Sequence, residues 1–330
     1  MVSDFISVGV IGTGYAAKLR CDAFSQDERS RLVAIAGRHQ SKTIAFATSY
    51  QTEASQQVKV MESWEELVSH PDVELVVISN VNSLHAQIVR AAIAHGKHVV
   101  VEYPISLEVD EAEELIELAK SKNLFLHIEH IELLSSLHLT LREYLKELGE
   151  IFYVRYSTIK PQNPAPRKWT YTHKHFGFPL TGALSRLHRL IDLFGKVSTV
   201  NSHNRFWATE EEYYQSCFST TQLCFESGLL AEIAYGKGET LWQAERKFEV
   251  QGENGALVFN GNNGVFIQQG ETKEISIATR RGLFAQDTKM VLEHLFNGTP
   301  LYVSPEESLY TLKVADSARL SAEVGITIVV

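Results

Sequence analysis

Cysteine is scarce in this sequence. The 330 residues include only three, Cys21, Cys217 and Cys224. Such an odd and sparse set disfavours a disulfide framework and indicates a reducing compartment. The chain also lacks the paired Cys or His spacing that binds zinc, so we expect no metal site.

Long apolar runs and an excess of positive charge are missing as well. No run approaches the roughly 18 residues that cross a bilayer, and the N-terminus lacks the basic flank and cleavage site of a signal peptide. Lysine and arginine number 31 against 40 acidic residues, a formal net charge of −9. An acidic chain is poorly suited to nucleic acid or to an anionic membrane. We therefore expect a cytoplasmic protein with a small-molecule partner, and its oligomeric state stays open.

The composition is otherwise that of an ordinary globular protein, with 44% hydrophobic and 22% charged residues. A chain of this length suggests two domains, since a domain averages about 150 residues. The pattern of apolar residues changes near residue 130. We expect a dinucleotide-binding domain over residues 1–130 and a substrate-binding domain over residues 131–330.

The first domain alternates short apolar runs with helical patterns. This alternation predicts an α/β fold, a doubly wound parallel sheet of the Rossmann type. The predicted strands are 8–11, 32–36, 75–78, 98–101 and 124–127, and the predicted helices are 16–25, 43–50, 63–68, 85–95 and 110–121.

The second domain shows runs of period-2 alternation separated by turn signals. The pattern predicts an α+β domain with a large, mostly antiparallel sheet. The predicted strands are 152–158, 198–205, 218–225, 229–235, 248–251 and 257–260, and the predicted helices are 136–148, 180–194, 283–296 and 305–324. The last helix could return to the first domain, and the apolar segment 326–330 is interpreted as a buried edge strand.

A G-x-G-x-x-A motif follows the first predicted strand. Gly12 makes the tight turn, Gly14 lets the backbone approach a pyrophosphate, and Ala17 allows the helix to pack closely on the strand. Thr13 and Tyr15 complete the loop. The motif predicts a dinucleotide site at this strand–helix junction; the alternative is a glycine turn without a ligand.

The second predicted strand ends without the carboxylate that an NAD site uses to hold the ribose. Arg38, Ser41 and Lys42 follow it instead, and these side chains suit a 2′-phosphate. We therefore expect NADP(H), unless Arg38 is a solvated surface residue. Asn80 and His85 are further cofactor-binding candidates.

Carboxylates gather where the next two strands end. Glu102 and Tyr103 should lie near the nicotinamide, because strand carboxyl ends face the ligand crevice in an open α/β sheet. Glu129 and Glu132 follow the next strand, and crowded carboxylates raise one another's pKa and can hold a proton. The alternatives are a helix cap for Glu102 and a solvated helix start for the other two.

A basic and aromatic segment stands out in this acidic chain. Arg167, Lys168, Trp169 and His173 suit a flat anionic ligand, with rings for stacking and cations for carboxylates. A solvated loop with a half-buried tryptophan is the alternative.

Two arginines share one face of the helical pattern near residues 180–194. Arg186 and Arg189 are three residues apart. An arginine does not exchange protons at ordinary pH, but it can orient a carboxylate or an acidic donor. A structural ion pair is the alternative for each.

Together these residues resemble the glucose–fructose oxidoreductase family over essentially the whole chain. That family carries Glu-Lys-Pro after the fifth strand, with the lysine as its usual catalytic residue, and an Asp and a His on a later helix. Here the three positions hold Tyr103, Ser185 and Arg189. The chain therefore lacks the machinery for alcohol oxidation, whose base must take an O–H proton.

The residues that differ from the wider family are similar to those of its biliverdin reductase branch, in the cyanobacterial type. The matching segments are 102–104 (EYP), 129–134 (EHIELL), 162–166 (QNPAP), 169–171 (WTY), 176–179 (FGFP) and 185–186 (SR). The resemblance implies NADPH-dependent reduction of biliverdin at its central methine carbon, with Arg186 organising proton delivery from Glu102, Glu129 or Glu132. The resemblance implies no metal site in this chain.

Two other functions remain open at this stage. One is an NADP-dependent sugar or polyol dehydrogenase of the same fold, and the other is a sensor that binds NADPH or a bilin without turnover. For a reductase we expect an activity optimum below neutrality, because mild acid protonates both histidines of the basic segment and the clustered carboxylates.

Overall fold

The computed structural model describes residues 4–51, 57–208, 212–278 and 281–330. The chain forms two compact units. The first unit holds Met1–Ile131 with Gly282–Leu309, and the second holds Glu132–Arg281 with Tyr310–Val330. Within the described ranges, no helix is long and apolar enough to cross a membrane.

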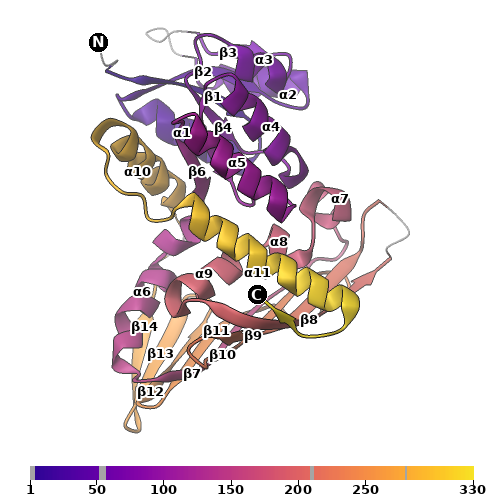
Figure 1. The fold of residues 1–330 in the computed structure, drawn as a ribbon, viewed down its shortest axis with the longest axis vertical. Helices are drawn as coiled ribbons and strands as arrows, with labels where there is room; N and C mark the ends of the chain where they lie inside the picture. The colour runs from indigo at the N-terminus through magenta and orange to yellow at the C-terminus, as the bar shows by residue number, and fades with distance from the viewer. Residues whose placement is uncertain (1–3, 52–56, 209–211, 279–280) are drawn as a thin grey trace. The chain divides into compact units, whose positions relative to one another are not determined.

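A six-stranded parallel sheet forms the centre of the first unit, in the order β3-β2-β1-β4-β5-β6 (Figure 1). Its strands are β1 (Ile6–Ile11), β2 (Ser30–Ala36), β3 (Lys59–Met61), β4 (Leu75–Ile78), β5 (His98–Glu102) and β6 (Leu126–Glu129). The central strands are almost entirely buried, which is why they are continuous apolar runs in the sequence. Because all six strands are parallel, their carboxyl ends meet at one edge.

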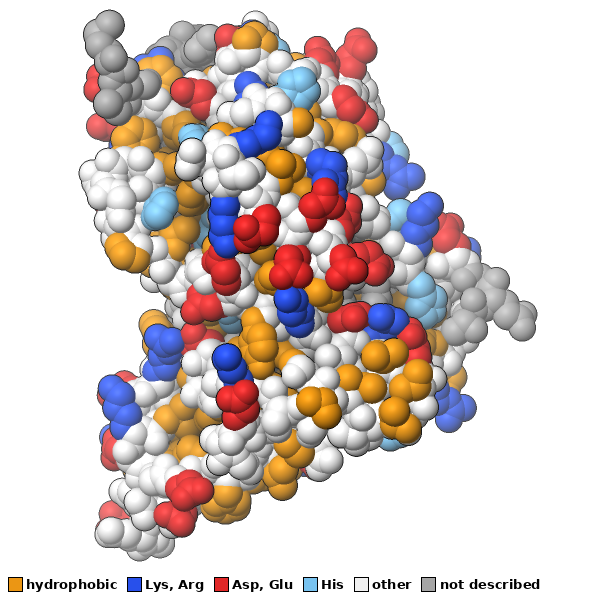
Figure 2. Space-filling model, in the orientation of Figure 1, with side chains coloured by type: hydrophobic (Ala, Val, Ile, Leu, Met, Phe, Trp, Pro, Cys, Tyr) orange, Lys and Arg blue, Asp and Glu red, His pale blue; other side chains and the backbone are white. Residues whose placement is uncertain are grey.

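Helices pack on this sheet. They are α1 (Tyr15–Gln26), α2 (Gln40–Thr48), α3 (Trp64–Ser69), α4 (Asn82–Ala94), α5 (Val109–Ser121) and α10 (Leu283–Asn297). Helices α4 and α5 lie side by side in Figure 1, and acidic and basic side chains are interspersed over the surface of this unit in Figure 2. Arg90 pairs there with Glu114 at 2.6 Å, and Lys120 with Glu117 at 2.8 Å. Exposed pairs of this kind neutralise the surface and add little stability.

The position of α10 differs from the sequence-based expectation. A single division after residue 130 would place this helix in the second unit, but it packs against α1 of the first. The physical reason is a buried ion pair, since Asp287 of α10 is the counter-ion of Arg20 on α1. The last helix, α11 (Pro305–Val324), begins in the first unit and ends in the second.

A nine-stranded sheet forms the second unit, in the order β14-β13-β12-β11-β7-β10-β9-β8-β15. Its strands are β7 (Ile151–Pro161), β8 (Val197–Trp207), β9 (Ser216–Phe225), β10 (Leu230–Gly238), β11 (Glu245–Gly252), β12 (Gly255–Asn260), β13 (Asn263–Gln268), β14 (Glu271–Ser276) and β15 (Ile328–Val329). Only the β7–β10 pairing is parallel. The predicted fold class, a Rossmann sheet followed by a large and mostly antiparallel one, is confirmed.

Short helices accompany the second sheet. They are η1 (Ile131–Leu134), α6 (Ser136–Tyr144), η2 (Leu145–Glu147), η3 (Trp169–Tyr171), α7 (His173–Phe176), α8 (Pro179–Gly182) and α9 (Ser185–Phe194). Side chains alternate between the two faces of the sheet. Tyr156, Ile233 and Tyr235 are buried on one face, while Arg155 and Glu232 are directed to the other.

The C-terminal segment forms an edge strand, as expected, but not a buried one. Strand β15 pairs with β8, yet the side chain of Val329 is 78% exposed. The apolar sequence alone could not distinguish these two environments.

Candidate active site

The turn between β1 and α1 has the geometry that its glycines predict. Gly12 has φ +133°, and a Cβ there would lie 2.2 Å from the Ser79 carbonyl oxygen. Gly14 caps α1 and is open, because a Cβ there would meet no atom within 4 Å. Ala17 is fully buried behind the turn. The first glycine is thus required by the fold, whereas the second leaves open space in front of the helix N-terminus.

The start of α1 offers unsatisfied N–H donors to an anion. Gly14 provides no side-chain cap, and the first turn of the helix carries no acidic residue. Tyr15 is 78% exposed beside this turn. Thr13 lies against Gly37, where a Cβ would meet the Thr13 methyl group at 2.8 Å. This cradle fits the pyrophosphate of a dinucleotide.

The end of β2 carries positive charge and no carboxylate. Arg38 precedes α2, and Ser41 and Lys42 lie in its first turn, which contains no acidic residue. All three side chains are exposed. No other described residue binds the Arg38 guanidinium by an ion pair or a side-chain hydrogen bond. Arg38, Ser41 and Lys42 are thus accessible to a ligand at the end of β2.

Glu102 and Glu129 end two neighbouring strands and are paired in register. The Glu129 carboxyl is buried and within hydrogen-bonding reach of Glu102. Burial and the neighbouring Glu102 carboxylate raise the pKa of Glu129 well above its usual value. A hydrogen bond between two carboxyl groups requires a proton, so this pair keeps one to a higher pH than an isolated carboxyl would. Glu129 also accepts a hydrogen bond from the Ile131 amide at 2.8 Å.

A buried network, which the sequence did not reveal, supports this pair. Arg20 is fully buried, donates to Glu102 at 3.3 Å and forms an ion pair with Asp287. Asp287 also binds His127 at 2.8 Å and the Tyr302 hydroxyl at 2.6 Å. Burial opposes ionisation of Asp287, but Arg20 and His127 hold its pKa well below the usual value. The network therefore contains a fixed charge at Asp287 and a titratable proton at Glu129.

Tyr103 stands where the wider family has its lysine. Its ring is stacked on His130, with centroids 5.2 Å apart and planes 8° from parallel. His130 is buried and binds the Ser308 hydroxyl at 2.8 Å. The stack fixes the Tyr103 ring at the carboxyl edge of the sheet.

His85 and Asn80 do not have equivalent environments. His85 is 1% exposed, and its Nδ1 binds the Pro104 carbonyl oxygen at 2.8 Å. Burial lowers the pKa of His85, so the ring is neutral. His85 supports the turn after Tyr103 instead of facing solvent, whereas Asn80 is half-buried at the end of β4.

Glu132 and Arg189 bind each other. Arg189 is fully buried and donates to the Glu132 carboxylate at 3.0 Å and to the Tyr156 hydroxyl at 2.7 Å. This is the structural ion pair that the sequence left as the alternative. Their charges are already compensated inside the second unit, so we leave both out of the proposed site.

Arg186, one turn earlier on α9, has a different environment. It is half-buried, with its guanidinium 5.2 Å from the centroid of the Tyr235 ring. Stacking on a ring leaves the edge of a guanidinium able to bind a carboxylate.

The basic segment lies mainly at the surface of the second unit. Arg167, Lys168 and His173 are exposed, and Trp169 is half-buried. Arg167 stacks over Tyr213 at 5.4 Å. Partial burial lowers the pKa of His173. This histidine therefore gains its charge at a lower pH than a free imidazole.

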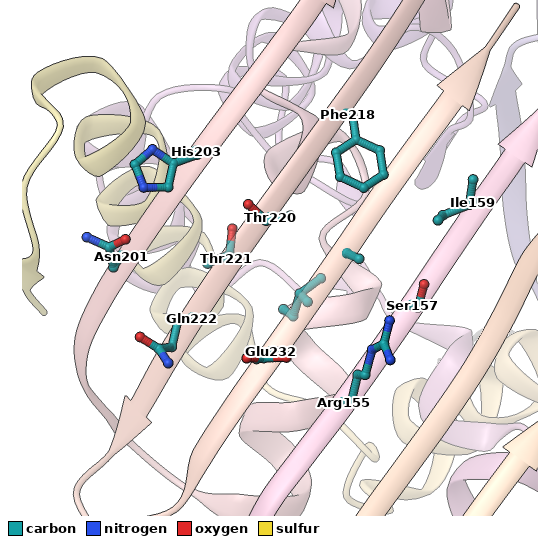
Figure 3. Close-up of a pocket in the computed structure, with 12 residues that line it drawn as sticks. Arg155, Ser157, Ile159, Asn201, His203, Phe218, Thr220, Thr221, Gln222 and Glu232 are labelled. Atoms are coloured by element: carbon teal, nitrogen blue, oxygen red, sulfur yellow. The ribbon is translucent and has the colours of Figure 1, made fainter. Parts of the chain in front are cut away.

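A groove crosses the other face of the large sheet (Figure 3). Its volume is about 410 Å³. The residues that line it include Arg155, Ser157, Asn201, His203, Phe218, Thr220, Gln222 and Glu232. These side chains alternate with buried ones such as Tyr235, so the groove and Arg186 lie on opposite faces of the sheet. The residues that line this groove do not include the predicted substrate residues.

The parallel sheet, its glycine turn and the acid–base groups at its carboxyl edge define a dinucleotide-dependent oxidoreductase. The profile described as "Oxidoreductase family, NAD-binding Rossmann fold" matches residues 6–130, and that of the family's C-terminal alpha/beta domain matches residues 142–329. The chain belongs to this family, that of glucose–fructose oxidoreductase. No group of three or more His, Cys, Asp or Glu in the described residues is arranged to hold a metal ion.

Three proteins illustrate what this chain is similar to. The chain is similar to the crystal structure of biliverdin reductase in complex with biliverdin and NADP+ from Synechocystis sp. PCC 6803, with 46% identity over 96% of this chain and 99% of that one and a TM-score of 0.92. It is 34% identical to human biliverdin reductase A over 165 residues, which are 50% of this chain and 51% of the human protein. It is 23% identical to scyllo-inositol 2-dehydrogenase (NADP(+)) of Bacillus subtilis over 98% of this chain and 96% of that protein.

Proposed function

We propose that this chain is a cytoplasmic biliverdin reductase that uses NADPH. The observation that carries the proposal is the 46% identity, over 96% of the chain, to a biliverdin reductase solved with biliverdin and NADP+. Biliverdin is a flat tetrapyrrole with two propionates. Reduction of its central methine carbon requires a hydride and a proton, which reaches a pyrrole nitrogen.

The chain's own residues would hold the dinucleotide in the first unit. The N–H groups at the start of α1, behind the open space at Gly14, would bind the pyrophosphate. Arg38 and Lys42 would bind the 2′-phosphate and select NADPH over NADH. When bound, NADPH supplies the hydride.

The proton would come from the pair of Glu102 and Glu129. Glu129 keeps its proton to a higher pH than an ordinary carboxyl, because it is buried beside Glu102. Arg20 donates a hydrogen bond to the Glu102 carboxyl and fixes its position beside Glu129. Tyr103, held on His130, provides a ring at the same edge for packing against a flat ligand.

Substrate carboxylates would bind in the second unit. Arg186, stacked on Tyr235, is our first choice because its guanidinium is preoriented and half-exposed. Arg167, Lys168, Trp169 and His173 form the adjacent part of the candidate site.

Polyol oxidation is the competing proposal, and the relative from B. subtilis favours it. It requires a base that removes an O–H proton. Tyr103 occupies the position of the family lysine, and the Glu102–Glu129 pair holds a proton instead of accepting one. These features favour reduction of a conjugated acceptor.

The test is an absorbance assay with purified protein, biliverdin and NADPH, with NADH as the donor control. We expect the blue-green band to give way to a yellow one, with NADPH the better donor by at least about tenfold. R38A should remove most of that preference, because an unpaired 2′-phosphate loses a charge-assisted contact.

Two arginine variants test which face of the large sheet binds the substrate. R186A should lower kcat/KM by about 100-fold, the usual scale for losing a charged contact to substrate. R155A, in the groove on the other face, should leave kcat/KM within about twofold. The reverse order would move the substrate site to the groove.

Other outcomes have definite meanings. A bilin spectrum that shifts on binding without consumption of NADPH would replace the proposal with a sensor. No bilin binding, with NADP+ reduction by a sugar alcohol from a panel, would replace it with a polyol dehydrogenase.

A further inference from the structure

Lys237 is a buried cation that has no part in the hydride and proton transfers proposed above. It lies on β10 and is 5% exposed. Its ammonium donates to the Thr170 carbonyl oxygen, in the basic segment, and lies 3.4 Å from the centroid of the Phe176 ring. A lysine is seldom buried so fully without a carboxylate.

Aromatic rings take the place of that carboxylate. Three tyrosine rings surround the same ammonium, with centroids at 5.0 Å for Tyr171, 5.6 Å for Tyr214 and 5.8 Å for Tyr235. With Phe176 they form what we call the ring cage. Each ring attracts a charged ammonium through its π face and attracts a neutral amine far less. The cage is therefore sensitive to the protonation of Lys237.

The charged groups around Lys237 oppose its protonation. Arg186 on α9, Lys168 in the basic segment and Lys160 on β7 are all positive. Cys217 on the neighbouring strand β9 is paired with Lys237 and acts in the opposite direction, although burial raises the pKa of that thiol. Burial and these cations lower the pKa of Lys237 to about 7.

Two other groups of the cage are also neutral in this range. Burial raises the pKa of Tyr171 to about 12 and moves that of Tyr214 further upward. Lys237 is therefore the group of the cage that changes charge near neutrality, and it carries its charge in mild acid.

The cage is joined to the substrate-binding candidates. Trp169 packs on Phe176 with ring centroids 6.1 Å apart. Phe176 also packs on Gly182, where a Cβ would meet its ring at 2.7 Å, just before α9 begins. Arg186 shares the Tyr235 ring with Lys237. A change at the ammonium thus reaches both Trp169 and Arg186 through direct contacts.

We propose that Lys237 is a positioning residue for the anionic substrate: when charged, it holds the segment from Thr170 to Phe176 in place and adds positive charge beside Arg186. When neutral, it does neither. The inference rests on the proposed function, because it assumes a substrate with carboxylates.

Kinetics provide the first test. In the wild type, KM for biliverdin should rise about tenfold between pH 6 and pH 8, which is the scale of losing one charge near a ligand carboxylate. The protonation of Lys237 should affect KM and not kcat. K237M should show the high KM at every pH. K237R, which stays charged, should keep KM low at pH 8. K160M removes a neighbouring exposed lysine that opposes the protonation of Lys237, so it should retain the dependence and move it to higher pH.

Fluorescence provides a test that needs no turnover. The emission of Trp169 should change with a midpoint near pH 7 as the cage loosens. W169F identifies the signal, since the chain has four tryptophans. K237M and K237R should abolish the transition and K160M should keep it.

The outcomes separate the two proposals. An unchanged fluorescence transition in K237M, or an unchanged KM profile, overturns the role of Lys237 even if biliverdin is reduced. If the protein does not act on biliverdin, the proposed function fails, while the fluorescence titration still decides whether Lys237 controls the segment. A K237R that does not fold leaves K237M to decide.

Discussion

At the residue scale, two glutamates three positions apart have opposite roles. Glu129 lies beside another carboxyl and holds a proton, whereas Glu132 lies beside Arg189 and is ionised within a structural pair. The sequence placed both among the candidate acids, because the local pattern is the same. Only the long-range neighbours distinguish them.

The pH dependence of the reaction should follow Glu129. Its raised pKa means that the donor form is present at low pH and is lost as the pH rises through that value. We predict that wild-type kcat falls as the pH rises through the raised pKa of Glu129. E129Q, which keeps the shape without a transferable proton, should lower kcat by about 100-fold and remove this fall.

The measurement is a pH–rate profile from pH 5 to 8 for the wild type, E129Q and the surface variant E114Q. Glu114 is exposed on α5, so E114Q should behave as the wild type. A wild-type profile that is flat or rises with pH would exclude Glu129 as the donor, as would an E129Q with normal kcat.

At the scale of elements, the turn between β1 and α1 uses its two glycines for different purposes. Gly12 is enclosed by the fold, while Gly14 faces open space. The sequence predicted both roles, because the motif specifies them at fixed spacing.

Two alanine variants should separate these roles. G12A places a Cβ 2.2 Å from the Ser79 carbonyl oxygen at φ +133°, so it should lower the free energy of unfolding by on the order of 1–3 kcal/mol. G14A should change that free energy by less than about 0.5 kcal/mol and weaken NADP+ binding at least about tenfold. Urea denaturation and NADP+ titration measure the two effects. A destabilised G14A with normal NADP+ affinity would contradict this interpretation.

Helices and strands were predictable where buried side chains recur at a regular spacing along the chain. The buried strands of the first sheet and the long helices are in the expected places. Strand β3 has only three residues, which is too short for a pattern. Strand β14 is exposed along almost all of its length, so it carries no apolar alternation.

Site residues were predictable where a local motif marks them, as at the glycine turn and at Glu102. Arg20, Asp287 and Lys237 were missed because their function depends on partners distant in sequence. Arg20 and Asp287 are 267 positions apart. The only local signal was a charge within an apolar helix face, as at Arg20 beside Ala17, Cys21 and Phe24.

At the scale of the whole molecule, the Arg20–Asp287 pair joins two parts of the first unit that are far apart in the sequence. R20M leaves the Asp287 carboxylate buried without its cation, so it should cost about 3–5 kcal/mol of unfolding free energy. R29Q removes a half-exposed arginine that binds Asp27 and Glu293 on the same two helical regions, and should cost less than about 1 kcal/mol.

Urea denaturation of the two variants makes the comparison. R20M/D287N should recover part of the loss, because neither buried group is then charged. If R20M costs no more than R29Q, the buried pair does not hold the unit together.

The same pair has a consequence for synthesis on the ribosome. The strands of the first sheet are all made by residue 129, but Asp287 leaves the exit tunnel only after strands β7 to β14 of the second sheet have been translated. Until then the nascent first unit has an arginine at its centre that can pair with Glu102 but lacks its buried partner Asp287. We expect this unit to stay loosely folded while most of the second sheet forms, so the dinucleotide site would mature late although its sequence comes first.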